Sequence, residues 1–191
     1  MAVLRKASTY SKMKVVPYTR ISRKKSKSYI KVVPPQKIVK FTMGNSSIYN
    51  RGGFPHILTL TSTEDVQIRH NALEACRQCI HRMLEKDFSG QFYFKVVPFP
   101  HHIQRENKML TGAGADRMQT GMQLSFGKSV GKAALVKKNS PVFVIALGSE
   151  KALIKTRICL KQIKSKLPCH TRVAYEYHKP EVQENTDSQI D

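Results

Sequence analysis

The fold of this chain is indicated first by the sequence Val66-Gln-Ile-Arg-His-Asn-Ala-Leu-Glu-Ala-Cys-Arg-Gln-Cys-Ile-His-Arg-Met-Leu-Glu-Lys86. Apolar side chains recur there at steps of three and four residues, a spacing that places them along one face of an α-helix. The members of this stripe are Ile68, Ala72, Ala75, Cys76, Cys79, Ile80, Met83 and Leu84. The stretch therefore predicts an amphipathic helix over about residues 66–86 with one buried face.

A second helix is predicted to begin after Ser149, a favourable N-cap residue, with Glu150 in the first turn. Pro168 ends it, because proline cannot continue the helical hydrogen bonds. A shorter helix is expected at about residues 115–125. The buried side of the second helix is expected to carry Thr156, Cys159, Leu160, Ile163 and Leu167, and its outer side Lys151, Lys155, Lys161 and Lys164.

Six runs of β-branched or aromatic residues, bounded by Gly, Pro, Asn or Ser, predict strands. They lie near residues 37–43, 56–60, 91–97, 132–136, 142–147 and 171–177. Strands interrupted by two amphipathic helices indicate an α+β protein. We expect a two-layer α/β sandwich with a mixed, mostly antiparallel sheet and two helices on one side. A basic N-terminal arm and a projecting glycine-rich loop complete this picture.

The charge of the chain points to a polyanionic partner. Lys and Arg number 33 against 13 Asp and Glu, which gives a formal net charge of +20 over 191 residues. Residues 1–63 contain no carboxylate, whereas the C-terminal end is acidic. We therefore divide the chain into a basic RNA-binding extension (1–36), a sandwich core (37–178) with a loop at 103–117, and an acidic, disordered tail (179–191).

Membrane and export functions are disfavoured by the same sequence. The longest purely apolar run, residues 142–147, is too short to cross a bilayer, and the chain has no tryptophan to anchor it at a membrane surface. The N-terminus has no apolar signal segment, and its cations are mostly Lys rather than the Arg of transit peptides. A cytoplasmic protein without a membrane partner is expected.

The basic arm combines cations with hydroxyl groups and an aromatic ring, all of which can contact phosphate, sugar or an exposed base. Its cations are Arg20, Arg23, Lys24, Lys25 and Lys27, and Tyr29 follows them. A purely solubilising tail is the alternative, but blocks of like charge are typical of interaction segments. Binding through several of these cations would weaken steeply with salt.

The segment 105–128 combines glycines, small residues and isolated cations in one loop. Gly112 and Gly114 let the backbone approach another molecule closely, so the loop suits a phosphate cradle or a finger inserted into an anionic partner. The cradle fails on spacing: Arg117 stands in place of the third glycine of a dinucleotide fingerprint, and Met122 in place of the first glycine of a P-loop. We therefore expect a finger that inserts into an anionic partner.

Cysteines and histidines do not form a convincing catalytic or metal site. Cys76 and Cys79 have the spacing of a zinc or redox pair, but both fall on the apolar helix face and no second close pair exists, so we interpret them as core residues. His101 and His102, adjacent on an extended segment, would point to opposite sides, and a structural or phosphate-contacting role is favoured. No catalytic triad or carboxylate pair stands out, so an enzyme is disfavoured and neither cofactor nor metal is expected.

Arg69, His70 and Asn71 open the first predicted helix, where backbone N–H groups favour phosphate. A phosphate contact and a merely solvated helix start remain equal alternatives at this point.

Seven motifs in order resemble one known family. They are Val16-Pro-Tyr-Thr-Arg20, Lys40-Phe-Thr-Met-Gly-Asn45, Gln67-Ile-Arg-His-Asn-Ala-Leu-Glu-Ala75, Pro100-His-His102, Arg105-Glu-Asn-Lys-Met109, Gly112-Ala-Gly-Ala-Asp-Arg117 and Ser125-Phe-Gly-Lys128. The match, over about residues 18–177, is to the archaeal and eukaryotic form of the large-subunit ribosomal protein family called L sixteen in bacteria.

The resemblance implies an α/β sandwich bound to ribosomal RNA near the corridor where tRNA enters, bracing RNA and helping to position tRNA without chemistry of its own. The RNA-facing candidates that it implies are Tyr18, Thr19, Arg20, Arg69, His70, Asn71, Arg105, Asn107 and Lys108, to which charge and position add His101, His102, Lys128 and Lys132 together with the cations of the arm. The loop that it places near tRNA comprises Thr111, Gly112, Ala113, Gly114, Ala115, Asp116 and Arg117.

The partners implied are large-subunit rRNA, tRNA, neighbouring ribosomal proteins and late-assembly factors, and no homo-oligomer is expected. Two rival functions remain: a free-standing RNA-binding regulator or assembly factor, and a phosphate-handling enzyme that uses the glycine loop.

Overall fold

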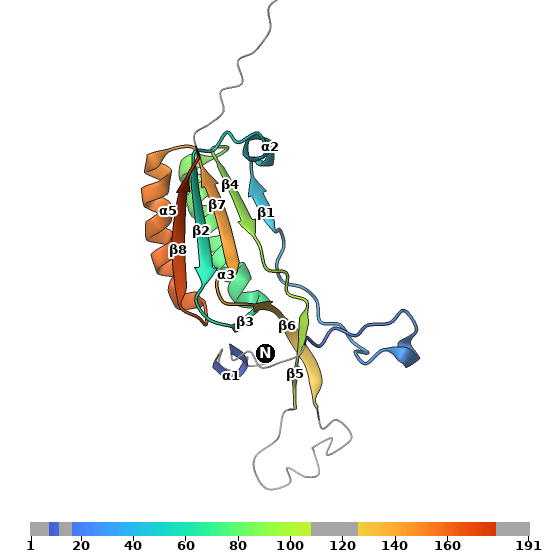
Figure 1. The fold of residues 1–191 in the computed structure, drawn as a ribbon. Helices are drawn as coiled ribbons and strands as arrows, with labels where there is room; N and C mark the ends of the chain where they lie inside the picture. Colours follow the sequence, from blue (N-terminus) through green and yellow to red (C-terminus); the bar gives the residue numbers. More distant parts are fainter. Residues whose placement is uncertain (1–7, 12–16, 108–125, 179–191) are drawn as a thin grey trace, which may run out of the picture.

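The computed structural model describes residues 8–11, 17–107 and 126–178. Its larger sheet has five strands in the order β1-β4-β7-β2-β8. They are β1 (Thr42–Gly44), β2 (His56–Ser62), β4 (Phe92–Val96), β7 (Pro141–Leu147) and β8 (Thr171–Tyr177). Helices α3 (His70–Phe88) and α5 (Glu150–Ile163) pack side by side against this sheet (Figure 1). This is the α+β sandwich that the sequence predicted.

A second, three-stranded sheet has the order β3-β6-β5. It consists of β3 (Val66–Arg69), β5 (His102–Glu106) and β6 (Lys128–Val136). The paired ends of β5 and β6 project from the sandwich as a hairpin (Figure 1). The single mixed sheet predicted from the sequence is wrong for the described part of the chain: two sheets are present, and every strand pair there is antiparallel.

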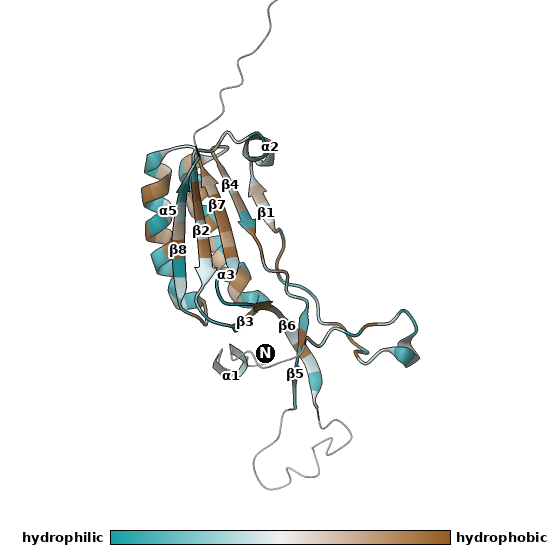
Figure 2. Cartoon of the chain, viewed as in Figure 1, coloured by the Kyte–Doolittle hydropathy of each residue, from teal (hydrophilic) through white to brown (hydrophobic). Residues whose placement is uncertain are grey.

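The core lies between the five-stranded sheet and the two helices, where apolar residues gather (Figure 2). Alternation along β2 explains its placement: Leu58 and Leu60 are buried, whereas Thr59 and Thr61 between them are half-buried. The largest fully buried side chains include Phe92, Phe94 and Phe143 from the sheet, Leu73, Ile80 and Leu84 from α3, and Leu160 from α5.

The first helix begins four residues later than the sequence predicted. Residues Val66–Arg69 form β3, in which Val66 pairs with Val136 and Arg69 with Ala133 of β6. Ile68 is buried in the strand as it would be in a helix, so local apolar spacing could not separate the two alternatives. The buried face also extends to Leu73 and Glu74, whereas Ala75 is only half-buried; Met83 is half-buried and packs against the core.

The prediction for α5 is confirmed in its main features. Ser149 caps the helix, and its side-chain oxygen accepts a hydrogen bond from the Ala152 N–H at 3.4 Å. The predicted inner residues Thr156, Cys159, Leu160, Ile163 and Leu167 are buried, and the predicted outer lysines are exposed. The α-helix ends at Ile163, however, and a short 3-10 helix, η3 (Lys164–Lys166), precedes Pro168.

Four other elements differ from expectation. The strand expected at 37–43 is limited to β1, and β6 begins earlier than residue 132. Helix α2 (Ser46–Asn50), too short for a periodic signal, is held by its N-cap, since Asn45 Oδ1 accepts from the Ile48 N–H at 3.1 Å. Strand β5 was not predicted, because its sequence is mostly polar. Its buried Gln104 is satisfied by a 3.2 Å side-chain hydrogen bond to Gln67.

The N-terminal arm leaves the sandwich and runs past the β5–β6 hairpin to η1 (Lys25–Lys27) (Figure 1). A four-residue helix, α1 (Ser8–Ser11), lies against β3. The helix expected at 115–125 and the tail at 179–191 lie outside the described residues.

Candidate nucleic-acid interface

The arm is attached along the edge of β5, next to the hairpin. The Tyr18 N–H donates to Nδ1 of His102 at 2.9 Å, and the Ile103 N–H donates to the Tyr18 carbonyl oxygen at 3.1 Å. Farther along, the Ser129 hydroxyl of β6 donates to the Val32 carbonyl oxygen at 2.7 Å. These bonds fix the arm to both strands of the hairpin, so that two parts of the chain far apart in sequence form one surface.

Two arginine–tyrosine stacks lie on this surface. The Arg105 guanidinium carbon of β5 is 4.1 Å from the ring centroid of Tyr18, and that of Arg20 is 4.1 Å from the ring of Tyr29. The Tyr18 hydroxyl also donates to the Tyr29 carbonyl oxygen at 3.2 Å. Cations and rings in such pairs can together contact phosphate and stack on bases.

The two adjacent histidines do point to opposite sides, as predicted. His102 is buried, and this burial lowers the pKa of its imidazole, with smaller contributions from the charges of His101 and Arg105. The neutral ring is what allows Nδ1 to accept from Tyr18. His101 is exposed, with Nδ1 3.0 Å from the Phe99 carbonyl oxygen. His102 therefore holds the arm in place, while His101 faces solvent.

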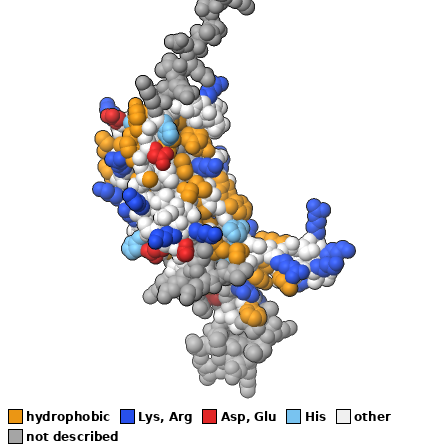
Figure 3. All heavy atoms as spheres, in the orientation of Figure 1, with side chains coloured by type: hydrophobic (Ala, Val, Ile, Leu, Met, Phe, Trp, Pro, Cys, Tyr) orange, Lys and Arg blue, Asp and Glu red, His pale blue; other side chains and the backbone are white. Residues whose placement is uncertain are grey.

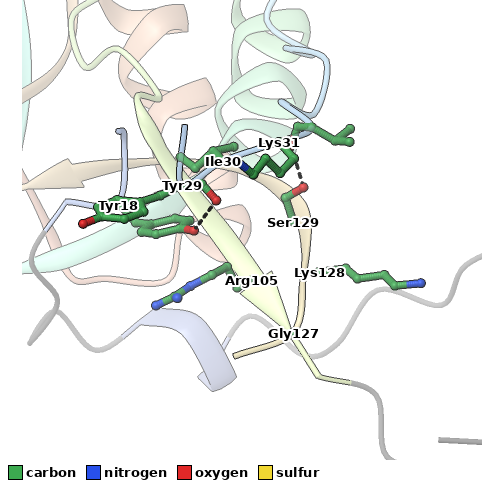
Figure 4. A pocket seen from close by; sticks show the side chains of 9 residues that line it. Tyr18, Tyr29, Ile30, Lys31, Arg105, Gly127, Lys128 and Ser129 are labelled. Atoms are coloured by element: carbon green, nitrogen blue, oxygen red, sulfur yellow. Dashed lines mark hydrogen bonds between the residues drawn. The ribbon is translucent and has the colours of Figure 1, made fainter. Parts of the chain in front are cut away.

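A hollow of about 490 Å³ lies between the arm and the hairpin, beside the bonds that join them. It is lined by Tyr18, Tyr29, Ile30, Lys31, Val32, Arg105, Gly127, Lys128 and Ser129. Figure 4 shows the tyrosines and Arg105 on one side of it and the Lys128 side chain pointing away on the other. Of these residues, Tyr18, Arg105 and Lys128 are site candidates predicted from the sequence. The participation of Val32 and Ser129 has no local sequence signal, since it depends on the arm crossing the hairpin.

Gly127 shapes the hairpin end of this hollow. Its φ is +80°, and a Cβ atom there would lie 2.2 Å from the carbonyl carbon of Glu106. Only glycine fits this close approach. Arg105, next to Glu106, also lies under the exposed ring of Phe126, with 5.3 Å between its guanidinium carbon and the ring centroid.

At the start of α3, His70 is buried, whereas Arg69 and Asn71 on either side of it are half-buried. His70 is 5% exposed, and burial is the first cause that lowers its pKa, followed by the charges of Lys37, Lys132 and Arg69. Within the described residues, Nδ1 of His70 and Oδ1 of Asn71 are buried without a hydrogen-bond partner. Arg69 lies over the ring of Tyr10 at 4.2 Å. A phosphate contact here stays a prediction.

The other predicted RNA-binding residues fall into three groups. Thr19, Arg20, Arg23, Lys24, Lys27, Asn107 and Lys128 are exposed, and Lys132 is half-buried. Lys25 lies in η1. Lys108 and the loop residues Thr111, Gly112, Ala113, Gly114, Ala115, Asp116 and Arg117 lie outside the described residues, although the loop joins the outer ends of β5 and β6.

A second basic surface lies on the other side of the sandwich, between α5 and β8. It carries Arg157, Lys161, Lys164 and Arg172 around a hollow of about 420 Å³, and Arg157 lies 5.1 Å from the ring of Tyr175. Figure 3 shows blue side chains in both places, on the arm at the right and over α5 and β8 at the left. The outward position of the two lysines is predicted from the helical spacing, but Arg172 joins them only through the packing of β8.

Cys76 is buried in the core and Cys79 packs against it, as predicted. All four thiols are free, and burial raises the pKa of Cys76 and of Cys159 to about 12, so both stay protonated at neutral pH. In the part of the chain that the structure describes, no group of three or more His, Cys, Asp or Glu side chains could hold a metal ion. Within that same part, no helix is long and apolar enough to span a membrane.

Comparison with known proteins shows which family the chain resembles. The family described as ribosomal protein L16p/L10e matches residues 16–174. The large ribosomal subunit protein uL16 of Hyperthermus butylicus is 44% identical over 158 residues, covering 82% of each chain. The uL16 protein of Methanoculleus marisnigri is 41% identical over 91% of this chain and 96% of its own. The uL16 protein of Sulfolobus acidocaldarius is 40% identical over 89% of this chain and 92% of its own.

These matches cover both the arm from residue 16 and the whole sandwich, and they confirm the resemblance found in the sequence motifs. The chain belongs to the ribosomal protein L16p/L10e family, whose members are structural proteins and not enzymes.

Proposed function

We propose that this protein is a structural component of the large subunit of the cytoplasmic ribosome, where it binds large-subunit rRNA through its arm and its β5–β6 hairpin. Its relatives carry the name of a large-subunit protein, which supports the assignment to that subunit. The observation that carries the RNA-binding surface is the attachment of the acid-free arm to the hairpin. This attachment brings Arg20, Arg105 and Lys128 together with exposed aromatic rings.

The exposed cations of the arm would supply the phosphate contacts, which position a protein on RNA and make binding salt-dependent. Residues 1–36 would act as the RNA-binding extension, residues 37–178 as the sandwich that carries it, and residues 179–191 as an acidic tail. Neighbouring ribosomal proteins and late-assembly factors are the further partners that we propose.

The loop at Thr111–Arg117 would reach towards tRNA in the corridor leading to the peptidyl-transferase region. The support is topological: the loop joins the outer ends of β5 and β6, at the tip of the hairpin that projects from the sandwich (Figure 1). Bracing RNA and positioning tRNA require no chemistry from the protein, in keeping with a structural family.

The test is to express a tagged chain in an archaeal cell and separate the extract on a sucrose gradient. Co-sedimentation with large subunits and translating ribosomes, and crosslinks from the arm to large-subunit rRNA, are expected. Recovery only in the free-protein fractions would overturn the proposal. Recovery on immature subunits but not on translating ribosomes would instead support an assembly factor.

The tRNA part needs a separate measurement. Replacement of residues 111–117 by a short Gly-Ser linker should leave incorporation into subunits intact and slow tRNA accommodation in a translation assay. An unchanged rate with normal incorporation would remove tRNA positioning from the proposal and leave the rRNA role standing.

A further inference from the structure

The hollow between the arm and the hairpin has the size and lining of a binding pocket rather than of a simple charged surface. Its volume of about 490 Å³ falls in the range of about 300–1,000 Å³ that is typical of small-ligand sites. Tyr18, Tyr29, Ile30 and Val32 of the arm form an apolar wall, and no carboxylate is among the lining residues. An occupant with a flat apolar body and a negative charge fits this combination.

One aromatic ring of the wall is available for stacking. Tyr29 is 64% exposed and lines the hollow, whereas Arg20, which stacks on it at 4.1 Å, does not line the hollow. The arginine therefore covers one side of the ring and leaves the remaining surface to an occupant. Stacking of a base on such a ring does not depend on sequence, because every base has a π-face.

Cations stand at the rim, where the phosphates of a bound nucleotide would lie. Lys128 is exposed and points outward from the hollow, and Arg105 is held next to the tyrosines by its stack on Tyr18 (Figure 4). An apolar wall with cations around it suits a base with its phosphates. A surface that binds duplex backbone alone needs cations but no aromatic wall.

The walls of the hollow are held in place by bonds within the protein. The Tyr18 hydroxyl bonds to the Tyr29 carbonyl, the Ile30 N–H donates to the Arg20 carbonyl at 3.3 Å, and Ser129 bonds to Val32. A ligand would find this site already formed, which removes most of the ordering that binding otherwise requires.

We propose that this hollow takes one unstacked base of single-stranded RNA, with the base against Tyr29 and its flanking phosphates near Arg105 and Lys128. The proposal rests on the RNA-binding function above and narrows it. The arm–hairpin surface would then distinguish a bulged or looped nucleotide from a regular duplex, because a paired base cannot leave its stack without losing its partner.

The test uses the full chain and a short oligouridine RNA that carries one 2-aminopurine at its centre, either single-stranded or paired with a complement. We expect tighter binding to the single strand, with quenching of the 2-aminopurine fluorescence. Tyr29→Ala should weaken single-strand binding by about tenfold or more, leave duplex binding unchanged and leave the salt dependence unchanged, because it removes stacking and no phosphate contact.

Two further variants keep the test decisive. Tyr29→Phe retains the ring and should retain binding and quenching. Val32→Trp, at a position that is 71% exposed, should fill the hollow and abolish the quenching without deleting a contact. Tyr177→Ala on β8, at a ring that is 62% exposed and outside the hollow, is the matched control and should behave as wild type.

Equal affinity for both RNAs, without quenching and without a Tyr29→Ala effect, would overturn the pocket while leaving RNA binding by the surface intact. Failure of the wild-type chain to bind either RNA would count against both proposals.

Discussion

The guanidinium of Arg105 lies over the ring of Tyr18, with 4.1 Å between the guanidinium carbon and the ring centroid. One residue comes from the β5–β6 hairpin and the other from the N-terminal arm, so the stack joins the two parts of the proposed RNA surface. A cation over a ring at a partly exposed site stabilises by about 0.5–1 kcal/mol, which is small beside the stability of a domain. Loss of the Arg105–Tyr18 stack is therefore expected to affect the proposed RNA-binding surface more than the stability of the fold.

Arg105→Ala should weaken RNA binding by about tenfold and reduce the salt dependence of binding, while the free energy of unfolding falls by no more than about 1 kcal/mol. Arg105→Lys keeps the charge but not the planar stack, and an intermediate affinity is expected. RNA titrations at several salt concentrations and urea unfolding measure the two effects. Lys151→Ala, an exposed change on α5, is the charge-matched control. An Arg105→Ala protein that unfolds easily but binds RNA normally would contradict this assignment.

Gly127→Ala should destabilise the chain by about 1–3 kcal/mol, because its φ is +80° and the new Cβ would meet the backbone of Glu106 at 2.2 Å. Gly90→Ala is the control, because Gly90 has a similar φ of +76° but open space around it. That variant should lose only the free energy that a positive φ costs alanine, about 1 kcal/mol. Urea unfolding of both variants gives the difference. Equal losses would show that the close approach to Glu106 does not constrain the hairpin.

Acidification should destabilise the folded chain through His70 and His102, because burial lowers both pKa values below the ordinary 6.5. Below pH 6.5 the unfolded chain binds protons that the folded chain does not. The free energy of unfolding therefore decreases as the pH is lowered, until the pKa values of the two histidines in the folded chain are reached. The slope is at most about 1.4 kcal/mol per pH unit for each histidine.

Unfolding free energies measured between pH 7.5 and about 5 test this pH dependence. His102→Gln and His70→Gln should each flatten the slope, whereas His170→Gln, at a side chain that is 93% exposed, should not. A slope that survives both buried changes would assign the effect to other groups.

Arg77→Ala should destabilise α3 strongly, by about 3 kcal/mol, because it leaves the buried Glu74 carboxylate without its cation. Arg77 Nη2 and Nε each donate to that carboxylate at 2.7 Å, and the hydrogen bond from Arg77 is the main cause that lowers the Glu74 pKa. The lowered pKa also means that this contribution is present at neutral pH and is lost as pH falls through the folded value, below the ordinary 4.5.

The double change Glu74→Leu with Arg77→Met should recover most of that loss, since it removes both charges together. Arg82→Ala, at an exposed position on the same helix, should change stability by less than about 0.5 kcal/mol. Thermal or urea unfolding provides the comparison. A double variant as unstable as Arg77→Ala would show that the loss of stability comes from helix packing and not from a Glu74 carboxylate without its cation.

Local signals were sufficient for α5 and for the strand alternation of β2. The cap at Ser149, the apolar spacing to Ile163 and the proline at 168 all lie within one short stretch, and each acts on its immediate neighbours. The ordered motifs likewise identified the family without a structure. The predicted start of α3 was wrong, because an apolar residue at the end of a strand satisfies the same spacing as one at the start of a helix.

By itself, then, the sequence determined the α+β class, the basic arm and the family, because composition and periodicity are properties of neighbouring residues. Only the tertiary structure decided that residues 66–69 form a strand, that Glu74 is buried, and that Tyr29 and Lys128 line one hollow. Each of these depends on packing or pairing with a residue outside the local pattern. The energy that selects them comes from backbone hydrogen bonds and burial between distant segments, which no local pattern contains.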